Sequence, residues 1–196
     1  MAESCLCLKD SGEISDGPYD INITNIGLVQ VFCDQQTDGG GWTLIQRRTS
    51  PFSMSFDRKW VEYENGFGNS LGEFWLGNKI LYELTKSPRE LRVDLKSREN
   101  TIGYAVYSYF KVNGPDVKYR LEISGYRGNI GDCGTSSSWQ QFATSDFDKG
   151  DCADDDNAGW WYTDCGCGDL NRQARPKWYS WKIANDDITF SEMKIR

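Results

Sequence analysis

The chain has 196 residues, enough to bury most of its apolar surface in one large domain or two small ones. Its net charge of -7 would repel phosphate backbones and anionic membranes, which argues against nucleic acid as a partner. Hydrophobic residues make up 38% of the chain, which indicates a globular core rather than disorder. No stretch reaches about 18 consecutive apolar residues, so we expect no membrane insertion.

The first part of the chain reads as β-structure. Alternating apolar and polar residues predict two strands at 19–23 and 28–33, which we expect to pair with each other. The glycine run at 39–41 follows, and then another strand at 43–48. A glycine run can also cradle a phosphate, but such loops lead into a helix and end in Lys-Ser or Lys-Thr. Because a strand follows here, the run predicts a turn.

The middle of the chain predicts one helix and three strands. Asn78 can cap a helix of about seven residues that ends before Pro88. Alternation then predicts strands at 91–95, 104–112 and 119–123. These strands, with the earlier ones, indicate a sheet that forms the centre of the domain.

The character of the sequence changes after Gly125. Residues 125–175 are rich in Gly, Asp, Ser, Asn and Cys, and they are too long for a passive connection. Such a segment is typical of a functional loop region. Two closing strands are predicted beyond it, at 178–183 and 193–196.

Seven cysteines and the absence of histidine restrict the chemistry. Without histidine there is no Ser-His-Asp or Cys-His catalytic arrangement. The cysteine usage is typical of an oxidised, secreted framework. The rival is a zinc site built on the Cys-x-Cys pairs 5/7 and 165/167, but zinc modules usually space these ligands further apart. Residues i and i+2 of a strand lie about 6.5 Å apart, so neither pair is expected to bond internally.

The stretch between Cys152 and Cys165 is the most informative part of the sequence. It is acidic at its start and ends in the aromatic block Trp160-Trp161-Tyr162. A disulfide across this 13-residue spacing would remove about 3 kcal/mol of unfolded-chain entropy on the loop-entropy model. It would also hold carboxylates beside aromatic faces, which favours a recognition loop. We expect Trp160 and Trp161 themselves to belong to the core.

Five blocks of sequence, in order along the chain, resemble the fibrinogen-related domain family. They are VFCD at 31–34 with GGGWTLIQRR at 39–48, GFG at 66–68 with EFWLGN at 73–78, LRVDL at 91–95, the stretch 152–165, and MKIR at 193–196. The resemblance implies an α+β fold with a central, mostly antiparallel twisted sheet, short helices and a long, disulfide-stapled ligand-binding region. It also implies a secreted recognition domain without enzymatic activity.

The resemblance implies a single domain that spans residues 1–196. The expected segments are an N-terminal disulfide subdomain (1–34), a central sheet region (35–124), a loop-rich binding region (125–182) and a closing strand (183–196).

The resemblance also implies two disulfides, and a third follows from the cysteines that remain. The expected pairs are Cys33 with Cys5 or Cys7, Cys152 with Cys165, and Cys133 with Cys167. One N-terminal thiol, on Cys5 or Cys7, is then left over. We expect it to link two chains into a homodimer; the alternative is a free, buried cysteine. The triplet Asn22-Ile23-Thr24 is an acceptor for N-glycosylation and fits a secreted chain.

Relatives in the family usually hold calcium just before the first cysteine of the recognition loop. Asp146 and Asp148 match the family's Asp-x-Asp arrangement, and oxygen ligands suit this ion. About four residues of the usual loop are missing before Cys152, and Lys149 brings a positive charge. The alternative is therefore a solvated acidic turn. No cofactor is required in either case.

The family's ligand pocket lies beside the same two cysteines. The matching positions here are Asp156, Tyr162, the Asp164–Cys165 peptide bond, which is often cis in the family, and Gly166. Gly166 replaces the histidine that is usual in the family. The segment between Asn171 and Trp178 is also about ten residues shorter than in the acetyl-binding relatives. The acetyl pocket of those relatives is therefore not complete in this chain.

The segment that follows brings cations and aromatic side chains into an acidic molecule. We expect Arg172 or Arg175 to bind the carboxylate of a sialic acid, because a guanidinium can hold a carboxylate through two hydrogen bonds. Trp178 or Tyr179 would pack against the sugar. The alternative is that these cations balance the neighbouring aspartates and have a structural role.

The leading functional prediction is a secreted lectin that recognises sialic acid or N-acetylated sugars on glycoproteins or cell surfaces, in innate defence and agglutination. The alternative is a protein-binding or peptide-binding module of the same fold. The acidic run Asp154-Asp155-Asp156 suits a cationic peptide better than an anionic sugar. A glycosidase pair among the aspartates is the remaining enzymatic alternative, and we expect no enzyme.

Overall fold

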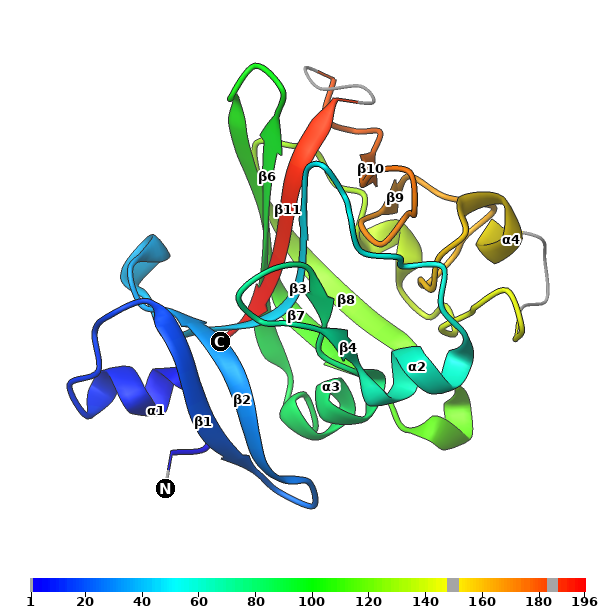
Figure 1. Cartoon of the computed structure of the whole chain (residues 1–196). Coiled ribbons are helices and arrows are strands. Elements are labelled where there is room, and N and C mark those ends of the chain that lie inside the picture. Colours follow the sequence, from blue (N-terminus) through cyan, green and yellow to red (C-terminus); the bar gives the residue numbers. More distant parts are fainter. Residues whose placement is uncertain (1, 148–151, 183–186) are drawn as a thin grey trace.

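The computed structural model describes residues 2–147, 152–182 and 187–196 (Figure 1). Within these residues, one antiparallel sheet of nine strands forms the centre of the domain. In pairing order, its main strands are β1 (Gly17–Ile23), β2 (Gly27–Asp34), β3 (Trp42–Thr49), β11 (Ile188–Ile195), β6 (Arg89–Ser97), β7 (Ile102–Val112) and β8 (Leu121–Gly128). Two short strands, β5 (Phe74–Trp75) and β4 (Phe67–Gly68), extend from β3. The expected α+β fold class is confirmed.

The remaining elements are short. The α-helices are α1 (Cys5–Asp10), α2 (Trp60–Asn65), α3 (Asn78–Leu84) and α4 (Cys152–Asp156). The 3-10 helices are η1 (Thr37–Gly39), η2 (Pro115–Val117) and η3 (Thr135–Ser137), and β9 (Gly168–Asp169) pairs with β10 (Lys177–Trp178) in a small second sheet. In the described part of the chain, no helix is long and apolar enough to cross a bilayer.

The last strand of the chain occupies the middle of the sheet. β11 pairs with β3 on one side and with β6 on the other, with Ser191 opposite both Arg48 and Leu95. The C-terminal strand therefore joins the part of the sheet that contains β1, β2 and β3 to the part that contains β6, β7 and β8 (Figure 1). β11 has a neighbouring strand on each side, and the side chains of its last residues, 193–195, are almost completely buried.

Five predicted strands are confirmed. Those at 19–23, 28–33, 43–48, 91–95 and 104–112 are each longer than predicted by one or two residues at an end. Alternation of apolar and polar side chains identifies strands such as 19–23 and 91–95, in which one face packs on the core, whereas β3 is buried on both faces.

Two further strand predictions need correction. The strand predicted at 119–123 begins only at Leu121, because Tyr119 has a left-handed backbone with φ of 50°. The strand predicted at 178–183 is wrong, because Trp178 ends the two-residue β10 and Trp181 donates its N–H to the Trp178 carbonyl in a turn. Both tryptophans are buried. A strand would point residues three apart to opposite faces, whereas the turn buries both.

The predicted turn and helix lie where the sequence placed them. Gly40 in the glycine run has φ of 71°, and a Cβ on it would collide with the Gln35 carbonyl, so the turn requires glycine. The helix predicted near Asn78 has the expected seven residues, but Asn78 is its first residue rather than its cap. Its Oδ1 accepts a hydrogen bond of 3.0 Å from the Trp75 indole.

The three disulfides are the pairs expected from the sequence. Cys5 is the N-terminal partner of Cys33, and the bond ties α1 to β2. The other two bonds are Cys133–Cys167 and Cys152–Cys165. Cys7 has no disulfide and is exposed, so the leftover thiol is not the buried one of the alternative reading.

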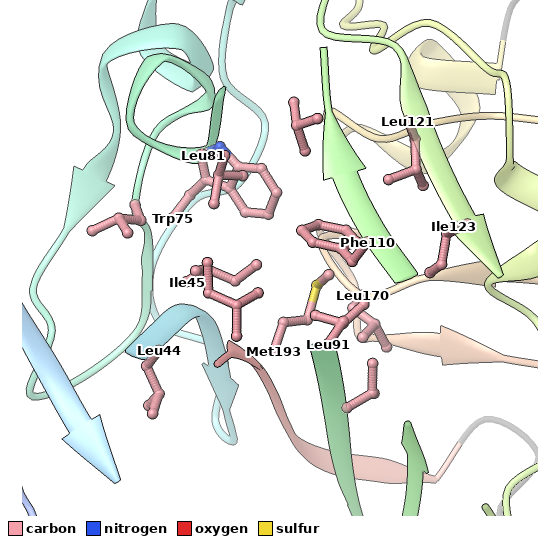
Figure 2. Close-up of a cluster of buried hydrophobic side chains, with 14 of the residues drawn as sticks. Leu44, Ile45, Trp75, Leu81, Leu91, Phe110, Leu121, Ile123, Leu170 and Met193 are labelled. Carbon is pink, nitrogen blue, oxygen red and sulfur yellow. The ribbon is translucent and has the colours of Figure 1, made fainter. Parts of the chain in front are cut away.

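A single cluster of buried side chains connects the sheet to the loop-rich region. Leu170, which precedes the segment with the predicted arginines, belongs to the same cluster as Phe110 and Met193 of the sheet (Figure 2). Trp161 is also buried there, and its indole N–H donates to the Tyr119 carbonyl at 2.8 Å. The expectation that Trp160 and Trp161 are core residues is confirmed. The loop-rich region is therefore packed on the sheet rather than detached from it.

Candidate ligand-binding site

The candidate site is built on the loop between Cys152 and Cys165. α4 begins at Cys152, and Cys165 at the other end of the loop is bonded to this first residue of the helix. Two residues further on, Cys167 is bonded to Cys133, which lies just after β8. In Figure 1, α4 lies near β9 and β10 at the side of the sheet. One disulfide thus closes the loop on itself and the other ties its end to the segment after β8, and both limit its conformational freedom.

The Asp164–Cys165 peptide bond, expected from the resemblance to be a candidate for the cis form, lies in a turn. Asp164, Cys165 and Gly166 have φ of 42°, 55° and 38°, and the Gly166 N–H donates to the Thr163 carbonyl at 2.7 Å. Among the described residues the cis peptide bond is Ser50–Pro51, so Asp164–Cys165 is trans. Three consecutive left-handed residues reverse the chain here without a cis bond.

Asp156 is the centre of the charge arrangement. Its carboxylate is buried and lies 2.8 Å from Nε of Arg172 and 2.9 Å from Nζ of Lys177. Lys177 also donates to the Cys165 carbonyl at 2.8 Å, so it connects both ends of the disulfide-closed loop. The Gln173 N–H donates to the Asp156 carbonyl at 3.1 Å. The loop and the cationic segment therefore form one interlocked unit.

A second buried carboxylate lies beneath this unit. Burial and, to a smaller extent, the charge on Asp156 together raise the pKa of Asp169 to about 7. The Asn171 N–H and the Tyr162 hydroxyl donate to its two oxygens at 2.9 and 3.0 Å. Burial also raises the pKa of Tyr162 far above its ordinary value, and Asp169 adds to this shift. Tyr162 therefore serves as a neutral hydrogen-bond donor.

The sheet fixes the position of the cationic segment. Arg48 of β3 is completely buried and donates to the carbonyls of Asn171 and Arg172 at 2.9 and 2.8 Å. Its Nε lies 3.0 Å from Glu73. Burial lowers the pKa of Arg48, and Glu73 opposes this shift. A buried guanidinium with fixed acceptors is a rigid support for the neighbouring Arg172.

The structure brings some of the predicted ligand residues together and separates others. Arg172 and Tyr179 are at the surface, with 31% of the Arg172 side chain and 53% of Tyr179 exposed. Arg175 is also partly exposed, 3.8 Å from Asp187. The proposal that Trp178 packs on a sugar is wrong, because its ring is buried and its indole donates to the Gly131 carbonyl at 3.1 Å.

The ion pairs agree with a structural role for part of the cations. Arg172 and Lys177 both neutralise Asp156, as the structural reading of this segment required. Lys177 is buried and has no surface left for a ligand, whereas Arg172 keeps about a third of its side chain in solvent. Arg172 therefore remains the candidate for an anionic ligand, with Asp156 as a competing partner.

Of the two calcium ligands predicted from the sequence, the structure describes Asp146 alone. The Asp146 Oδ1 accepts hydrogen bonds from the Trp60 N–H and the Thr144 hydroxyl at 2.9 and 2.8 Å. Asp148 lies outside the described residues. Within the residues that are described, no three His, Cys, Asp or Glu side chains gather to hold a metal ion. Both hydrogen bonds go to Oδ1 of Asp146, and calcium binding by Asp146 and Asp148 stays a prediction.

The predicted glycosylation acceptor is accessible. The Asn22 side chain points to solvent from β1, between the buried Ile21 and Ile23. The exposure is compatible with the sequence prediction of a glycan at this position.

One surface cavity was missed by the reasoning from sequence. It is lined by Lys118, Arg120, Trp139 and Phe147, and Tyr162 is shared with the predicted site. The available signal was Trp139, a large aromatic residue in a polar stretch rich in serine and glutamine. The cations that face it lie about 20 residues earlier in the chain, so only the fold brings the two segments together.

Comparison with known proteins agrees with this architecture. The chain belongs to the family of the fibrinogen beta and gamma chains, C-terminal globular domain, which matches residues 2–196. Domains of this family are non-catalytic binding modules, and the three disulfides make this one an extracellular domain.

Individual relatives support the same assignment. Angiopoietin-related protein 7 of Mus musculus is 39% identical over 184 residues, which cover 86% of this chain and 54% of that protein. The fibrinogen-like globe domain of human ANGPTL2 has a TM-score of 0.94 at 33% identity, and the match covers 100% of this chain and 99% of that one. A lamprey fibrin D-dimer complexed with the peptide Gly-His-Arg-Pro-amide has a TM-score of 0.88 at 30% identity, over 99% of this chain and 73% of that one. The chain spans about half the length of the curated relatives it matches.

Proposed function

We propose that this domain is a secreted lectin that binds sialylated or N-acetylated sugars on glycoproteins or cell surfaces, in agglutination and innate defence. One observation carries the proposal. Arg172, Asp156, Lys177 and Tyr179 form a continuous chain of contacts, in which Lys177 Nζ lies 2.9 Å from Asp156 and 5.3 Å from the Tyr179 ring centroid. The two ends of the chain, Arg172 and Tyr179, are the exposed ones.

Each exposed group has a defined task in this proposal. The Arg172 guanidinium provides hydrogen bonds to a sugar carboxylate or acetyl carbonyl. The Tyr179 ring provides an aromatic face for the C–H groups of the sugar. The buried Asp156 and Lys177 hold both groups in place, so little conformational entropy is lost when a ligand binds.

A glycan array tests the proposal. We expect sialylated or N-acetylated glycans to be bound, and Arg172→Gln to weaken binding of the sialylated ones by at least ten-fold, since charge-assisted hydrogen bonds contribute about 1.5–3 kcal/mol. Arg127→Gln is the matched control, because Arg127 is an exposed arginine on β8 outside the site. Binding by Arg172→Gln at the level of the unmodified domain would refute this site.

The same array tests the calcium prediction for Asp146 and Asp148. A second measurement in the presence of a chelator should leave binding unchanged if no calcium is held. Loss of binding that added calcium restores would establish the ion and its contribution.

A second function is supported by a specific observation. The lamprey fibrin structure that resembles this chain contains a peptide ligand with an arginine, and three aspartates are exposed here on or beside the disulfide-closed loop: Asp154, Asp155 and Asp164. These carboxylates would suit a cationic peptide. Titration with Gly-His-Arg-Pro-amide separates the two functions. Peptide binding together with an empty glycan array would favour a peptide-binding module.

A further inference from the structure

A cavity of about 390 Å³ lies next to the candidate site but is lined mainly by other residues. Two cations, Lys118 and Arg120, come from the segment before β8. Three aromatic side chains, Trp139, Phe142 and Phe147, come from the segment that follows η3. The volume lies within the usual range for small-ligand pockets, about 300–1,000 Å³.

Backbone hydrogen bonds fix the two walls of the cavity relative to each other. The Trp139 N–H donates to the Leu121 carbonyl at 2.7 Å, and the Leu121 N–H donates to the Gln140 carbonyl at 3.0 Å. The Phe142 N–H donates to the Lys118 carbonyl at 2.9 Å. The wall with the cations and the wall with the aromatic rings are thus parts of one hydrogen-bonded unit, which makes the cavity pre-formed.

Two of the aromatic side chains that line the cavity are exposed to solvent. Trp139 is 62% exposed and Phe147 is 44% exposed. Trp139 also has a left-handed backbone, with φ of 70°, which is uncommon and strained for a bulky residue. An exposed tryptophan in such a conformation gains nothing from core packing. The arrangement is typical of a surface kept for a ligand.

The two cations of the cavity are not neutralised. Neither Lys118 nor Arg120 has an ion pair among the described residues, although the chain carries a net charge of -7. The Arg120 Cζ lies 5.3 Å from the Trp139 ring centroid, and the Lys118 Nζ lies 4.5 Å from that of Phe147. The Arg120 Nε is buried and, in the described part of the protein, has no hydrogen-bond acceptor. A buried donor of this kind is unfavourable until an acceptor satisfies it.

We propose that this cavity is a second sugar subsite, which binds the carboxylate of an acidic sugar such as a uronic or sialic acid. Arg120 and Lys118 bind the carboxylate, and Trp139 packs on the C–H face of the ring. The amides of Gln140 and Gln141, which also line the cavity, bind the hydroxyl groups. The inference rests on the proposed lectin function and deepens it, because it gives acidic sugars a site separate from Arg172.

The decisive experiment titrates free sugars into the purified, disulfide-bonded domain by calorimetry. The probes are glucuronic acid, N-acetylneuraminic acid and neutral N-acetylglucosamine. We expect Arg120→Gln and Trp139→Ala each to weaken binding of both acidic sugars by about ten-fold or more. Arg120→Gln should leave the affinity for N-acetylglucosamine unchanged, and Arg127→Gln should change none of the three.

A second readout does not depend on affinity. Addition of glucuronic acid should shift the indole N–H resonance of Trp139, which Trp139→Phe identifies by its disappearance. Trp139→Phe retains an aromatic face, so it should bind acidic sugars better than Trp139→Ala. Unchanged thermal unfolding of the variants would show that lost binding is not lost folding.

The outcomes separate this inference from the proposed function. Acidic sugars that bind normally to Arg120→Gln and Trp139→Ala, but not to Arg172→Gln, would overturn the second subsite and leave the lectin function standing. Failure of all three sugars to bind the unmodified domain, with an empty glycan array, would overturn both. Loss at Arg120→Gln with retention at Arg172→Gln would support the cavity as the acidic-sugar site.

Discussion

The replacement Asp169→Asn should make the domain more stable at neutral pH. Asp169 is completely buried beneath the candidate site, and its pKa is about 7. An asparagine keeps the main contacts, because its Oδ1 can accept from the Asn171 N–H as Asp169 does. Its Nδ2 can donate to the Tyr162 oxygen, whose own proton is then directed at the Ala158 carbonyl, 3.0 Å away. The substitution therefore removes a titrating group with little change of shape.

The magnitude follows from the difference between the folded and unfolded pKa values. The pKa of Asp169 is raised from 3.8 to about 7, so between these values the folded state retains a proton that the unfolded state has lost. The free energy of unfolding therefore falls as pH rises through this window. About three pKa units at about 1.4 kcal/mol each give a loss of about 4 kcal/mol, complete above pH 7. The asparagine variant lacks this loss.

The assay is urea unfolding of both proteins from pH 4 to pH 8, without reductant. We expect Asp169→Asn to be about as stable as the unmodified domain at pH 4 and more stable by up to about 4 kcal/mol at pH 8. Asp34→Asn is the control, because the pKa of Asp34 is shifted in the opposite direction to that of Asp169. Burial opposes ionisation of Asp34, but hydrogen bonds from Lys194 and Thr37 outweigh it and hold the pKa at about 2. The stabilisation by ionised Asp34 is present above pH 3.8 and is lost as the pH falls below this value. Asp34→Asn should therefore leave the pH dependence of the free energy of unfolding between pH 4 and pH 8 nearly unchanged. A stability difference between Asp169→Asn and the unmodified domain that stays constant across this range would refute the reasoning.

Three further predictions follow from the charge network and the cysteines. Lys177→Met should lower the free energy of unfolding by about 3 kcal/mol in urea titrations, because it removes one partner of a buried ion pair, and an unchanged midpoint would contradict this. Replacing Cys152 and Cys165 together by serine should cost about 3 kcal/mol, the loop-closure value for 13 residues, and a cost below 1 kcal/mol would count against it. Cys7→Ser should leave stability unchanged and abolish a covalent homodimer on non-reducing electrophoresis; a monomer band from the unmodified chain would reject the interchain bond.

The sheet was predictable from sequence because each strand carries its own signal. Alternation within 19–23 or 91–95 reflects one buried face and needs no knowledge of the rest of the chain. The prediction of a strand at 178–183 is wrong because its tryptophans are buried by a turn and not by pairing in a sheet. Trp178 and Trp181 cover the loop-rich region from a turn, and burial without a regular period does not distinguish a turn from a strand.

The candidate site was predictable in its composition but not in its pairing. The sequence indicated that Asp156 and Arg172 lie near the same disulfide, but it did not show whether Arg172 forms an ion pair with an aspartate or stays available for a ligand. That choice depends on the position of the 171–173 backbone, which Arg48 of β3 determines from more than 120 residues away. The cavity between Arg120 and Trp139 depends in the same way on long-range pairing.

The two arginines that could bind a carboxylate differ in what already surrounds them. A ligand carboxylate at Arg172 would share the guanidinium with Asp156, and two like charges about 6 Å apart repel by about 3 kcal/mol at an effective dielectric constant of 20. Lys177 offsets part of this repulsion because it pairs with the same aspartate. Arg120 has no carboxylate partner among the described residues, so an acid bound there meets no such repulsion. An acidic sugar can therefore bind at either arginine, and the stronger discrimination in favour of acidic over neutral sugars is expected at Arg120.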